Sequence, residues 1–280
     1  MNHVGLGLRR EHYAYLLANK PRVAQWFEAI SENYLDSHGR PKAVLNEIRR
    51  NFPVALHGVS LSIGSALPPS RDYLSKLKDL ADEIDPFLIS DHFCWTGLQN
   101  ENLHDLLPLP FCEETVDTLC RNIDITQTFL GRSIALENVS SYITFRDSTM
   151  FEWEFICEIS KRSGCRILLD VNNVHVNATN HSFDALTYLN YIPGDSVAEI
   201  HIAGHSNRGA YLFDTHSTPV SEEVWRLLEH AVNRMPDVPV LLERDEDIPE
   251  FPELEMELEQ ALNHCASAET DSYLEVTQRR

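Results

Sequence analysis

The feature that most constrains this chain is a regular alternation of short strand-like runs with longer segments of helical spacing. Eight apolar runs bounded by turn residues recur along the 280 residues. They are Val4–Leu8, Phe27–Ser31, Val54–Gly58, Phe87–Asp91, Ser133–Asn138, Arg166–Val171, Val197–Ala203 and Pro239–Arg244. The helical segments between and after them are Pro41–Asn51, Tyr73–Ile84, Glu113–Leu130, Phe151–Ser163, Phe183–Leu189, Glu222–Arg234 and Leu254–Cys265. This alternation predicts βα units and a parallel sheet.

The number and spacing of the units favour a closed barrel. The runs begin about 34 residues apart, and a (β/α)8 barrel takes roughly 250 residues. A doubly wound open sheet also alternates, but Gly5 and Gly7 lack the third glycine that opens a helix in a phosphate-binding turn. We therefore predict one α/β domain, a TIM barrel over residues 1–267, followed by a polar, frayed tail over residues 268–280. The irregular stretch Phe93–Pro110 is expected to be a loop over the barrel mouth.

Composition argues against several classes of protein. The chain carries 43 acidic and 23 basic residues, a formal charge of −20, whereas nucleic acids and anionic lipids are bound through Lys and Arg. No apolar run reaches the roughly 18 residues of a membrane-spanning helix, and Met1–Glu11 shows no secretory signal. The six cysteines form no CxxC pair, which is typical of reduced thiols in the cytosol. We expect a cytoplasmic protein with no nucleic-acid or membrane partner.

Polar side chains follow the predicted strands where each one ends. Barrel enzymes place their chemistry at this edge, and seven of the eight strands deliver a carboxylate, an imidazole or both to it. The candidates are His57, His92, Glu137, Asp170, Asn173, His201 and Glu243, with Asp214 and His216 in the loop after the seventh strand. Asp214 and His216 are two residues apart, so in an extended segment both can face one ligand. His205 is a further candidate that faces the substrate or supports a ligand.

The convergence of these residues predicts a metal centre. Taken singly, each is more commonly a hydrogen-bonded structural residue or a surface turn. Several carboxylates at one barrel mouth, however, would repel one another and raise their own pKa values unless a cation lay among them. Mixed imidazole and carboxylate ligands suit iron, manganese or zinc better than calcium or magnesium. Nine candidate ligands exceed the coordination of one ion, so two or three ions are expected.

Seven segments, in order along the chain, resemble one known family. They are His57–Gly64, Ser90–His92, Leu136–Tyr142, Leu169–Val174, Glu199–His205, Asp214–His216 and Leu242–Asp245. The family is that of the multinuclear non-heme iron-dependent oxidases, which includes the methanobactin-biosynthesis oxidase and was long carried as an uncharacterised family. The resemblance extends from about residue 3 to residue 250.

The resemblance implies an xylose-isomerase-like TIM barrel that holds two or three iron ions in mixed Fe(II)/Fe(III) states. By position, the ligands of the paired irons correspond to His57, His92, Glu137, Asp170, His201 and Glu243. The ligands of the third iron correspond to Asn173, Asp214 and His216. Asn173 stands where some relatives carry His, and its amide oxygen is a weaker ligand, which implies a labile third site. We assign catalytic roles to Glu137, Asp170 and His205, with Glu137 placed to bridge two irons.

Family members use dioxygen to modify ribosomally made peptides, most often at cysteine. They commonly need a partner that binds the leader of the precursor peptide, and because this chain shows no domain for that task, a separate partner protein is expected. Two alternatives remain open. One is a metal-dependent isomerase or endonuclease built on the same barrel; the other is a non-catalytic subunit that binds a partner or stores metal.

Overall fold

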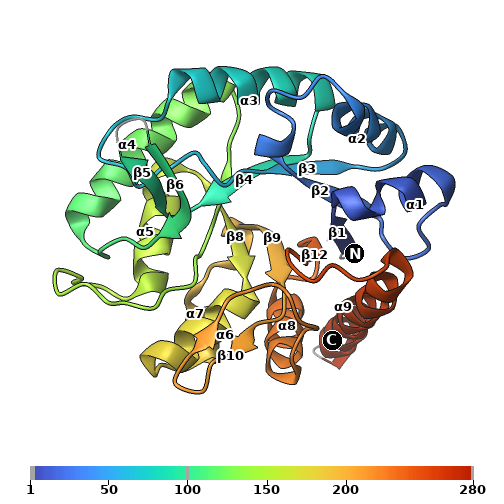
Figure 1. The fold of residues 1–280 in the computed structure, drawn as a ribbon. Coiled ribbons are helices and arrows are strands. Elements are labelled where there is room, and N and C mark those ends of the chain that lie inside the picture. The colour runs from blue at the N-terminus through green and yellow to red at the C-terminus, as the bar shows by residue number, and fades with distance from the viewer. Residues whose placement is uncertain (1–3, 99–100, 279–280) are drawn as a thin grey trace.

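The computed structural model describes residues 4–98 and 101–278, in which eight parallel strands form a closed barrel (Figure 1). Around the barrel the strands follow the order β1-β12-β9-β8-β7-β4-β3-β2, and β2 pairs again with β1. Their bounds are β1 Val4–Gly7, β2 Trp26–Ile30, β3 Val54–His57, β4 Leu88–His92, β7 Ala135–Glu137, β8 Arg166–Asp170, β9 Val197–Ile202 and β12 Val240–Leu242. The predicted TIM barrel is confirmed.

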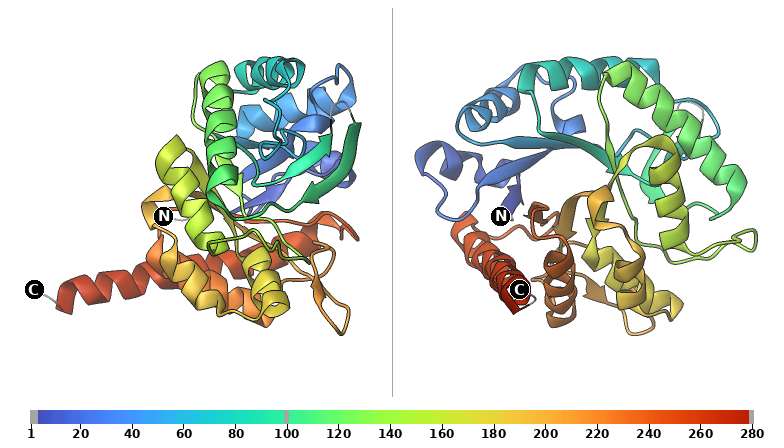
Figure 2. Two further views of the ribbon diagram at one scale, coloured as in Figure 1. Left: turned by 90° about the vertical axis from the view of Figure 1, so that its left-hand side faces the viewer. Right: turned by 180° about the vertical axis from the view of Figure 1, so that it is seen from behind.

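Helices surround the barrel on the outside (Figures 1 and 2). They are α1 Tyr13–Ala18, α2 Arg40–Asn51, α3 Arg71–Ile84, α4 Glu113–Leu130, α5 Glu152–Ser163, α6 Val171–His181, α7 Ala185–Tyr191, α8 Glu222–Arg234 and α9 Phe251–Gln278, with single 3-10 turns at Arg10–His12, Ser31–Asn33 and Gly194–Ser196. Local chemistry sets several of their ends. Ser221 caps α8 by accepting the backbone N–H of Val224, and Pro41 lies in the first turn of α2, where its missing N–H costs nothing.

Two layers of side chains fill the barrel interior, and they explain where the polar site lies. The lower layer is apolar and contains Trp26, Ala55, Leu88, Ala135, Leu168 and Leu241. Side chains on a strand return to the same face every second residue. Two residues further toward the carboxyl ends the same strands carry Glu28, His57, Ser90, Glu137, Asp170 and Glu243, all of them buried. The barrel therefore changes from an apolar to a polar interior within one step of strand alternation.

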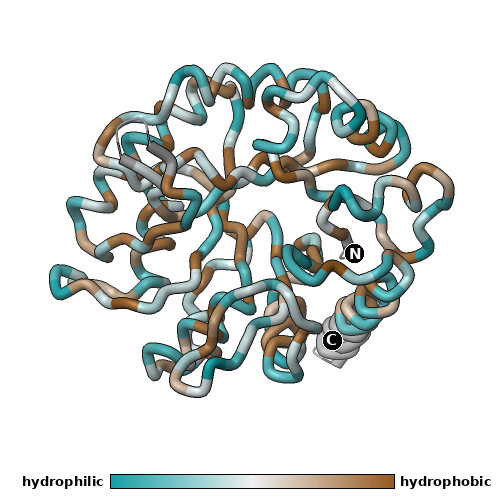
Figure 3. The backbone as a smooth tube through the Cα atoms, viewed as in Figure 1, coloured by the Kyte–Doolittle hydropathy of each residue, from teal (hydrophilic) through white to brown (hydrophobic). Residues whose placement is uncertain are grey.

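The main hydrophobic core lies between the strands and the helices that cover them. Val4, Phe27, Leu56, Ile167 and Val240 are each less than 1% exposed and pack in one cluster with the inner faces of the helices. Hydrophobic residues accordingly follow the strands, and hydrophilic ones gather on the outer helix faces (Figure 3). Within the described residues no helix is long and apolar enough to span a membrane.

The structure departs from expectation mainly in the connections. Phe93–Pro110, predicted to be an irregular loop, forms the hairpin β5 Trp95–Leu98 and β6 Glu101–Leu107. This hairpin projects from one end of the barrel, opposite to the end past which α9 extends (Figure 2). A second, unpredicted hairpin joins β10 Ser206–Asn207 to β11 Leu212–Phe213. Helix α9 continues over residues 268–278, where a frayed tail is expected, and the domain boundary at residue 267 stays a prediction.

Candidate metal centre

A cavity of about 480 Å3 opens at the carboxyl ends of the barrel strands. Seven of the nine predicted ligands line it: His57, His92, Glu137, Asn173, Asp214, His216 and Glu243. The other two, Asp170 and His201, are fully buried and lie in contact with these ligands, Asp170 beside His216 and His201 beside Glu137. The structure therefore brings all nine together. Eight form three overlapping groups that share Glu137 and Glu243, and Asn173 lies beside Glu137. Glu28, Glu199 and His201 form a further group that could hold a metal.

The first group consists of Glu137 and two imidazoles. Glu137 Oε2 lies 3.4 Å from His57 Nε2 and 3.3 Å from His92 Nε2. The opposite ring nitrogens are held from behind, because His57 Nδ1 lies 2.8 Å from Ser90 Oγ and His92 Nδ1 lies 3.1 Å from the Gly58 carbonyl oxygen. Because a carbonyl oxygen can only accept a hydrogen bond, it favours the proton on Nδ1 of His92, and the Nε2 lone pair is then available to bind a metal.

The second group joins Glu137 to Asp170, His201 and Glu243, whose ligand atoms all lie within 4.8 Å of one another. Asp170 is the N-cap of α6: one of its oxygens accepts the backbone N–H of Asn173 at 2.6 Å, and Oδ2 remains free for a metal. His201 Nδ1 lies 3.1 Å from Glu243 Oε2. Helix α6 thus begins at a ligand and positions the next candidate, Asn173, one turn later.

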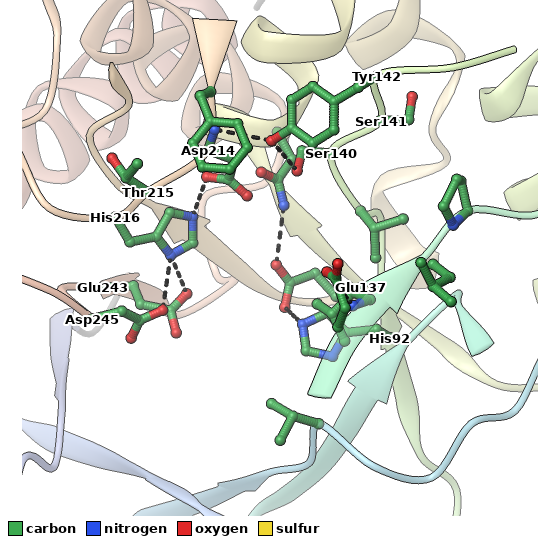
Figure 4. A pocket seen from close by; sticks show the side chains of 18 of the residues that line it. His92, Glu137, Ser140, Ser141, Tyr142, Asp214, Thr215, His216, Glu243 and Asp245 are labelled. Atoms are coloured by element: carbon green, nitrogen blue, oxygen red, sulfur yellow. Dashed lines mark hydrogen bonds and ion pairs between the residues drawn. The ribbon is translucent and has the colours of Figure 1, made fainter. Parts of the chain in front are cut away.

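The third group surrounds His216. Its Nε2 lies 2.7 Å from Asp214 Oδ1, and its Nδ1 lies 3.2 Å from Glu243 Oε2 and 3.4 Å from Asp245 Oδ2 (Figure 4). The backbone at His216 has φ +46°, in the left-handed region that non-glycine residues rarely adopt. This turn brings the imidazole back toward Asp214, so the two side chains contact each other, as well as facing a shared space.

The titratable groups of the cavity strongly shift one another's pKa values. Burial raises the pKa of Glu137 to about 8 and that of Asp170 to about 7. Burial opposes ionisation of Glu243 as well, but His201 and His216 beside it hold its pKa well below the usual range. Burial also lowers the pKa of His57 far below its ordinary value. Against burial, which lowers them, the neighbouring carboxylates raise the pKa of His92 to about 9 and raise the pKa of His201 and His216, so these imidazoles hold positive charge that a metal ion could replace.

Unpaired buried atoms give an independent test of whether metals fit. Among the described residues, buried side-chain oxygens without a hydrogen bond include Glu137 Oε2, Asp170 Oδ2 and Asn173 Oδ1 at this site. Other such atoms, among them His12 Nδ1 and Ser31 Oγ, lie outside the ligand groups. Leaving one such atom unsatisfied costs about 1–3 kcal/mol. Metal coordination would use the three oxygens at the site. The mixture of imidazole and oxygen donors suits iron, manganese or zinc.

His205, predicted to be catalytic, does not line the cavity. Its Nδ1 lies 2.8 Å from Asn172 Oδ1, and the Asn172 side-chain amide donates a hydrogen bond of 2.9 Å to Asp214 Oδ1. His205 therefore reaches the third group only through Asn172, and it is placed to orient that amide and hold Asp214.

Four site residues were not predicted from the sequence. Glu28 and Glu199 lie beneath the second group, where His201 Nε2 is 3.5 Å from Glu28 Oε2 and 3.2 Å from Glu199 Oε1. Asp245 lies beside His216, and Arg9 pairs with Asp245 and lies 3.3 Å from Glu243. Glu199 and Asp245 each lie two residues from a predicted ligand, so strand alternation could have found them. No spacing in the sequence points to Arg9.

Comparison with solved structures agrees with the fold. The crystal structure of 3-keto-D-glucoside 4-epimerase, YcjR, from E. coli matches with a TM-score of 0.61 at 12% identity, over 95% of this chain and 100% of that one. A structure of L-ribulose 3-epimerase matches with a TM-score of 0.57 at 14% identity, over 100% of this chain and 96% of the other. These are xylose-isomerase-like TIM barrels, as predicted, and at such identities the likeness shows the fold alone.

Comparison with known sequences identifies the family. A UPF0276 protein of Rhizorhabdus wittichii is 51% identical over 258 residues, which are 92% of each chain. A UPF0276 protein of Caulobacter vibrioides is 46% identical over 268 residues, 96% of each chain. The model of a family described as "RiPP precursor modification enzyme MbnB/TglH/ChrH", where RiPP denotes a ribosomally synthesised and post-translationally modified peptide, matches residues 3–266. The chain belongs to this family of enzymes that modify RiPP precursors.

Proposed function

We propose that this protein is a multinuclear non-heme iron-dependent oxidase that uses dioxygen to modify a ribosomally made peptide, most often at a cysteine. The observation that carries the proposal is the set of three ligand groups joined through Glu137 and Glu243. One metal ion would leave most of these buried donors unused. Two or three neighbouring ions use them all, and neighbouring ions can bind two reactants side by side.

We assign the ions as follows. The first would be held by His57, His92 and Glu137, and the second by Glu137, Asp170, His201 and Glu243. The third would be held by Asp214 and His216, with Asn173 Oδ1 as a neutral oxygen ligand. Glu137 is the carboxylate common to the first two, which fits a bridging role. The third ion has fewer anionic ligands available, because His216 and Asp214 also pair with each other, so it is expected to be the most labile.

When bound, iron supplies Lewis acidity toward a substrate thiolate and electrons for dioxygen. The protein's own residues do the remaining work. Glu137 and Glu243 set the spacing of the ions and balance their charge. His205, through Asn172, holds Asp214 in place. Asp105 to Pro108, at the end of the β5–β6 hairpin, form one wall of the cavity.

The proposal includes a precursor peptide as substrate and a separate protein that binds its leader. We also propose a cytoplasmic location. None of the six cysteines forms a disulfide in the described residues, which is in keeping with the reducing cytosol.

The proposal is tested by metal analysis and peptide oxidation together. Protein expressed in iron-rich medium is expected to contain two to three iron ions per chain, and in air to change the mass of a cysteine-containing peptide encoded beside its gene. One zinc and no iron would overturn the oxidase. Manganese or zinc with activity independent of oxygen would favour the isomerase or endonuclease alternative, for which the epimerase-like fold is the only support.

A further inference from the structure

Three exposed aromatic side chains surround one side of the cavity mouth. Tyr142, Tyr211 and Phe213 are 43%, 45% and 36% exposed, respectively. The rings of Tyr142 and Phe213 stack with centroids 5.2 Å apart, and Tyr211 approaches them at 6.0 and 6.3 Å. We call these three residues the aromatic rim. They come from two separate elements, since Tyr142 follows β7 and the other two belong to the β10–β11 hairpin.

The rim is physically tied to the metal-binding groups. Tyr142 and Phe213 line the same cavity as His216 and Glu137. The Tyr142 hydroxyl oxygen accepts the backbone N–H of Asp214 at 3.1 Å (Figure 4). A molecule that enters the cavity therefore contacts the rim as well as the ligands. Through its hydrogen bond, Tyr142 connects such a contact to Asp214.

An exposed aromatic surface of this kind indicates a binding site. Clustered apolar side chains at the edge of a polar site commonly mark recognition surfaces, and aromatic rings provide large contact areas at small entropic cost. Nothing among the groups described requires these rings for folding: the buried core lies on the other side of the strands. The Arg208 guanidinium lies 5.7 Å from the centre of the Phe213 ring and supports it from the hairpin.

The surface continues beyond the rim as an apolar groove. Ile143, 58% exposed, follows Tyr142 and belongs to both the cavity and a neighbouring hollow of about 300 Å3. That hollow is lined by Phe145, Met150 and Phe151 among others, and it shares Pro108, Ser141 and Ile143 with the cavity. A bound chain that fills the cavity can thus extend along a continuous apolar path, which a small sugar or a lone amino acid could not use.

We propose that the aromatic rim binds the substrate peptide through a large apolar side chain, aromatic or aliphatic, that flanks the modified residue. The proposal rests on the peptide-modifying function proposed above and adds a sequence preference to it. The metal groups would select the residue to be modified, and the rim would select its neighbour. The occupant is the substrate itself because two of the three rim residues line the reaction cavity.

The test measures binding of short fluorescein-labelled peptides to the iron-loaded full-length protein without oxygen, by fluorescence anisotropy. Gly-Gly-Cys-Gly-Gly is compared with versions that carry Phe on either side of the cysteine, and with the same peptides carrying Ser in place of Cys. We expect Phe on one side to tighten binding about tenfold, the size expected for one well-packed aromatic contact. Tyr211→Ser should abolish this gain, and Tyr211→Phe should keep it.

Tyr191→Ser is the matched control, since Tyr191 is a 50% exposed tyrosine on α7 that does not belong to the aromatic rim. The proposal is overturned if the Phe and Gly peptides bind equally, if no peptide binds, or if Tyr191→Ser loses the gain as fully as Tyr211→Ser. If the rim instead binds a partner protein, Tyr211→Ser will bind the peptides as tightly as the unaltered protein does, and this result too overturns the proposal. The proposed oxidase function can fail separately. If Phe still tightens binding of the Ser peptides but the protein oxidises no peptide, the rim proposal stands and the oxidase proposal is contradicted.

Discussion

Glu137 is the residue at which the chemistry of the site concentrates. Its Oε2 has no hydrogen bond, although it lies within 3.7 Å of nitrogens of His57, His92 and His201. A carboxylate surrounded by three imidazoles is placed where one group can bridge two metal ions. The same placement makes it expendable for folding, because it belongs to the polar layer above the apolar interior of the barrel.

We therefore expect Glu137→Gln to fold to the same barrel, with a lower melting temperature, and to lose most of the metal pair. The amide keeps the shape but not the negative charge, and it bridges two metals poorly. Peptide oxidation should fall by at least two to three orders of magnitude, roughly the several kcal/mol that metal catalysis supplies. Iron content and peptide mass are measured side by side. Full activity in this variant would remove the bridging role.

Glu32 provides the control for that experiment. It lies at the end of β2, where its Oε1 accepts the Val59 N–H and the Tyr73 hydroxyl, outside the three ligand groups. Glu32→Gln removes the same charge near the same end of the barrel. Its iron content should stay close to that of the unaltered protein.

His201 shows how residues behind a ligand can decide what it binds. Its Nδ1 faces Glu243 and Glu137, whereas its Nε2 faces Glu199 at 3.2 Å and Glu28 at 3.5 Å. A carboxylate at Nε2 keeps the proton on that nitrogen, so that Nδ1 presents its lone pair to a metal.

Glu199→Gln should consequently weaken metal binding without unfolding the barrel. The amide can donate to Nε2 as well as accept from it, and so it permits the wrong imidazole tautomer. We expect a 10–100-fold loss of affinity, the usual effect of removing such a partner. Zinc titration measures the affinity, and 15N spectra of the zinc-loaded protein report the tautomer of His201. An unchanged affinity and an unchanged tautomer would show that Glu199 serves only to fill the interior.

At the scale of elements, the barrel strands and helices α2 to α5 and α7 to α9 could be predicted from the sequence, whereas α1, α6 and the two hairpins could not. All eight predicted runs contain or overlap a barrel strand, because burial on both faces demands continuous apolar residues. Helix α6 was missed: Val171–His181 is rich in Asn and His, which favour helices weakly, and it depends on the Asp170 cap. The two hairpins carry no strong alternation. The ligands at strand ends could be predicted once the strands were. Arg9 and Glu28 could not, because only the closed barrel brings them close to the other site residues.

Helix α5 begins with a carboxylate that should make stability depend on pH. Burial raises the pKa of Glu152 to about 7 from an ordinary value of 4.5, against hydrogen bonds from Tyr188 and Asn177 that lower it. A raised carboxylate pKa favours the folded state at low pH, and this contribution is lost as the pH rises from about 4.5 to 7. Glu152→Gln should therefore be more stable than the unaltered protein at pH 8, by about 1–2 kcal/mol after allowance for partial exposure.

Urea unfolding at pH 5 and pH 8 checks this expectation. The difference between variant and unaltered protein should grow from pH 5 to pH 8. Glu158→Gln, which makes the same charge change on the same helix, serves as the control. An equal difference at both pH values would mean that Glu152 does not titrate in this range.

For the whole molecule, bound metal ions would link strands across the barrel interior, above the apolar layer that already joins them there. The three groups draw ligands from β3, β4, β7, β8, β9 and the segments after β11 and β12. Without ions, the buried acids meet one another across the mouth, and the fold must either hold protons there or repel itself. Metal binding should therefore be a major contribution to the stability of the entire protein.

Chelation is expected to lower the melting temperature markedly, and to do so more at pH 8.5 than at pH 6.5. Metal present at about a thousand times its Kd contributes about 4 kcal/mol, which corresponds to roughly 8–16 °C for a chain of this size.

The pH dependence of this effect follows from the buried acids. Burial raises the pKa of Glu137 and of Glu199 to about 8 and that of Asp170 to about 7. Protons on these groups stabilise the metal-free fold at low pH, and this contribution is lost as the pH rises through 7 to 8. Calorimetry with and without chelator, and after anaerobic return of Fe(II), measures both effects. A melting temperature that chelator leaves unchanged at pH 8.5 would contradict the presence of metals among these carboxylates.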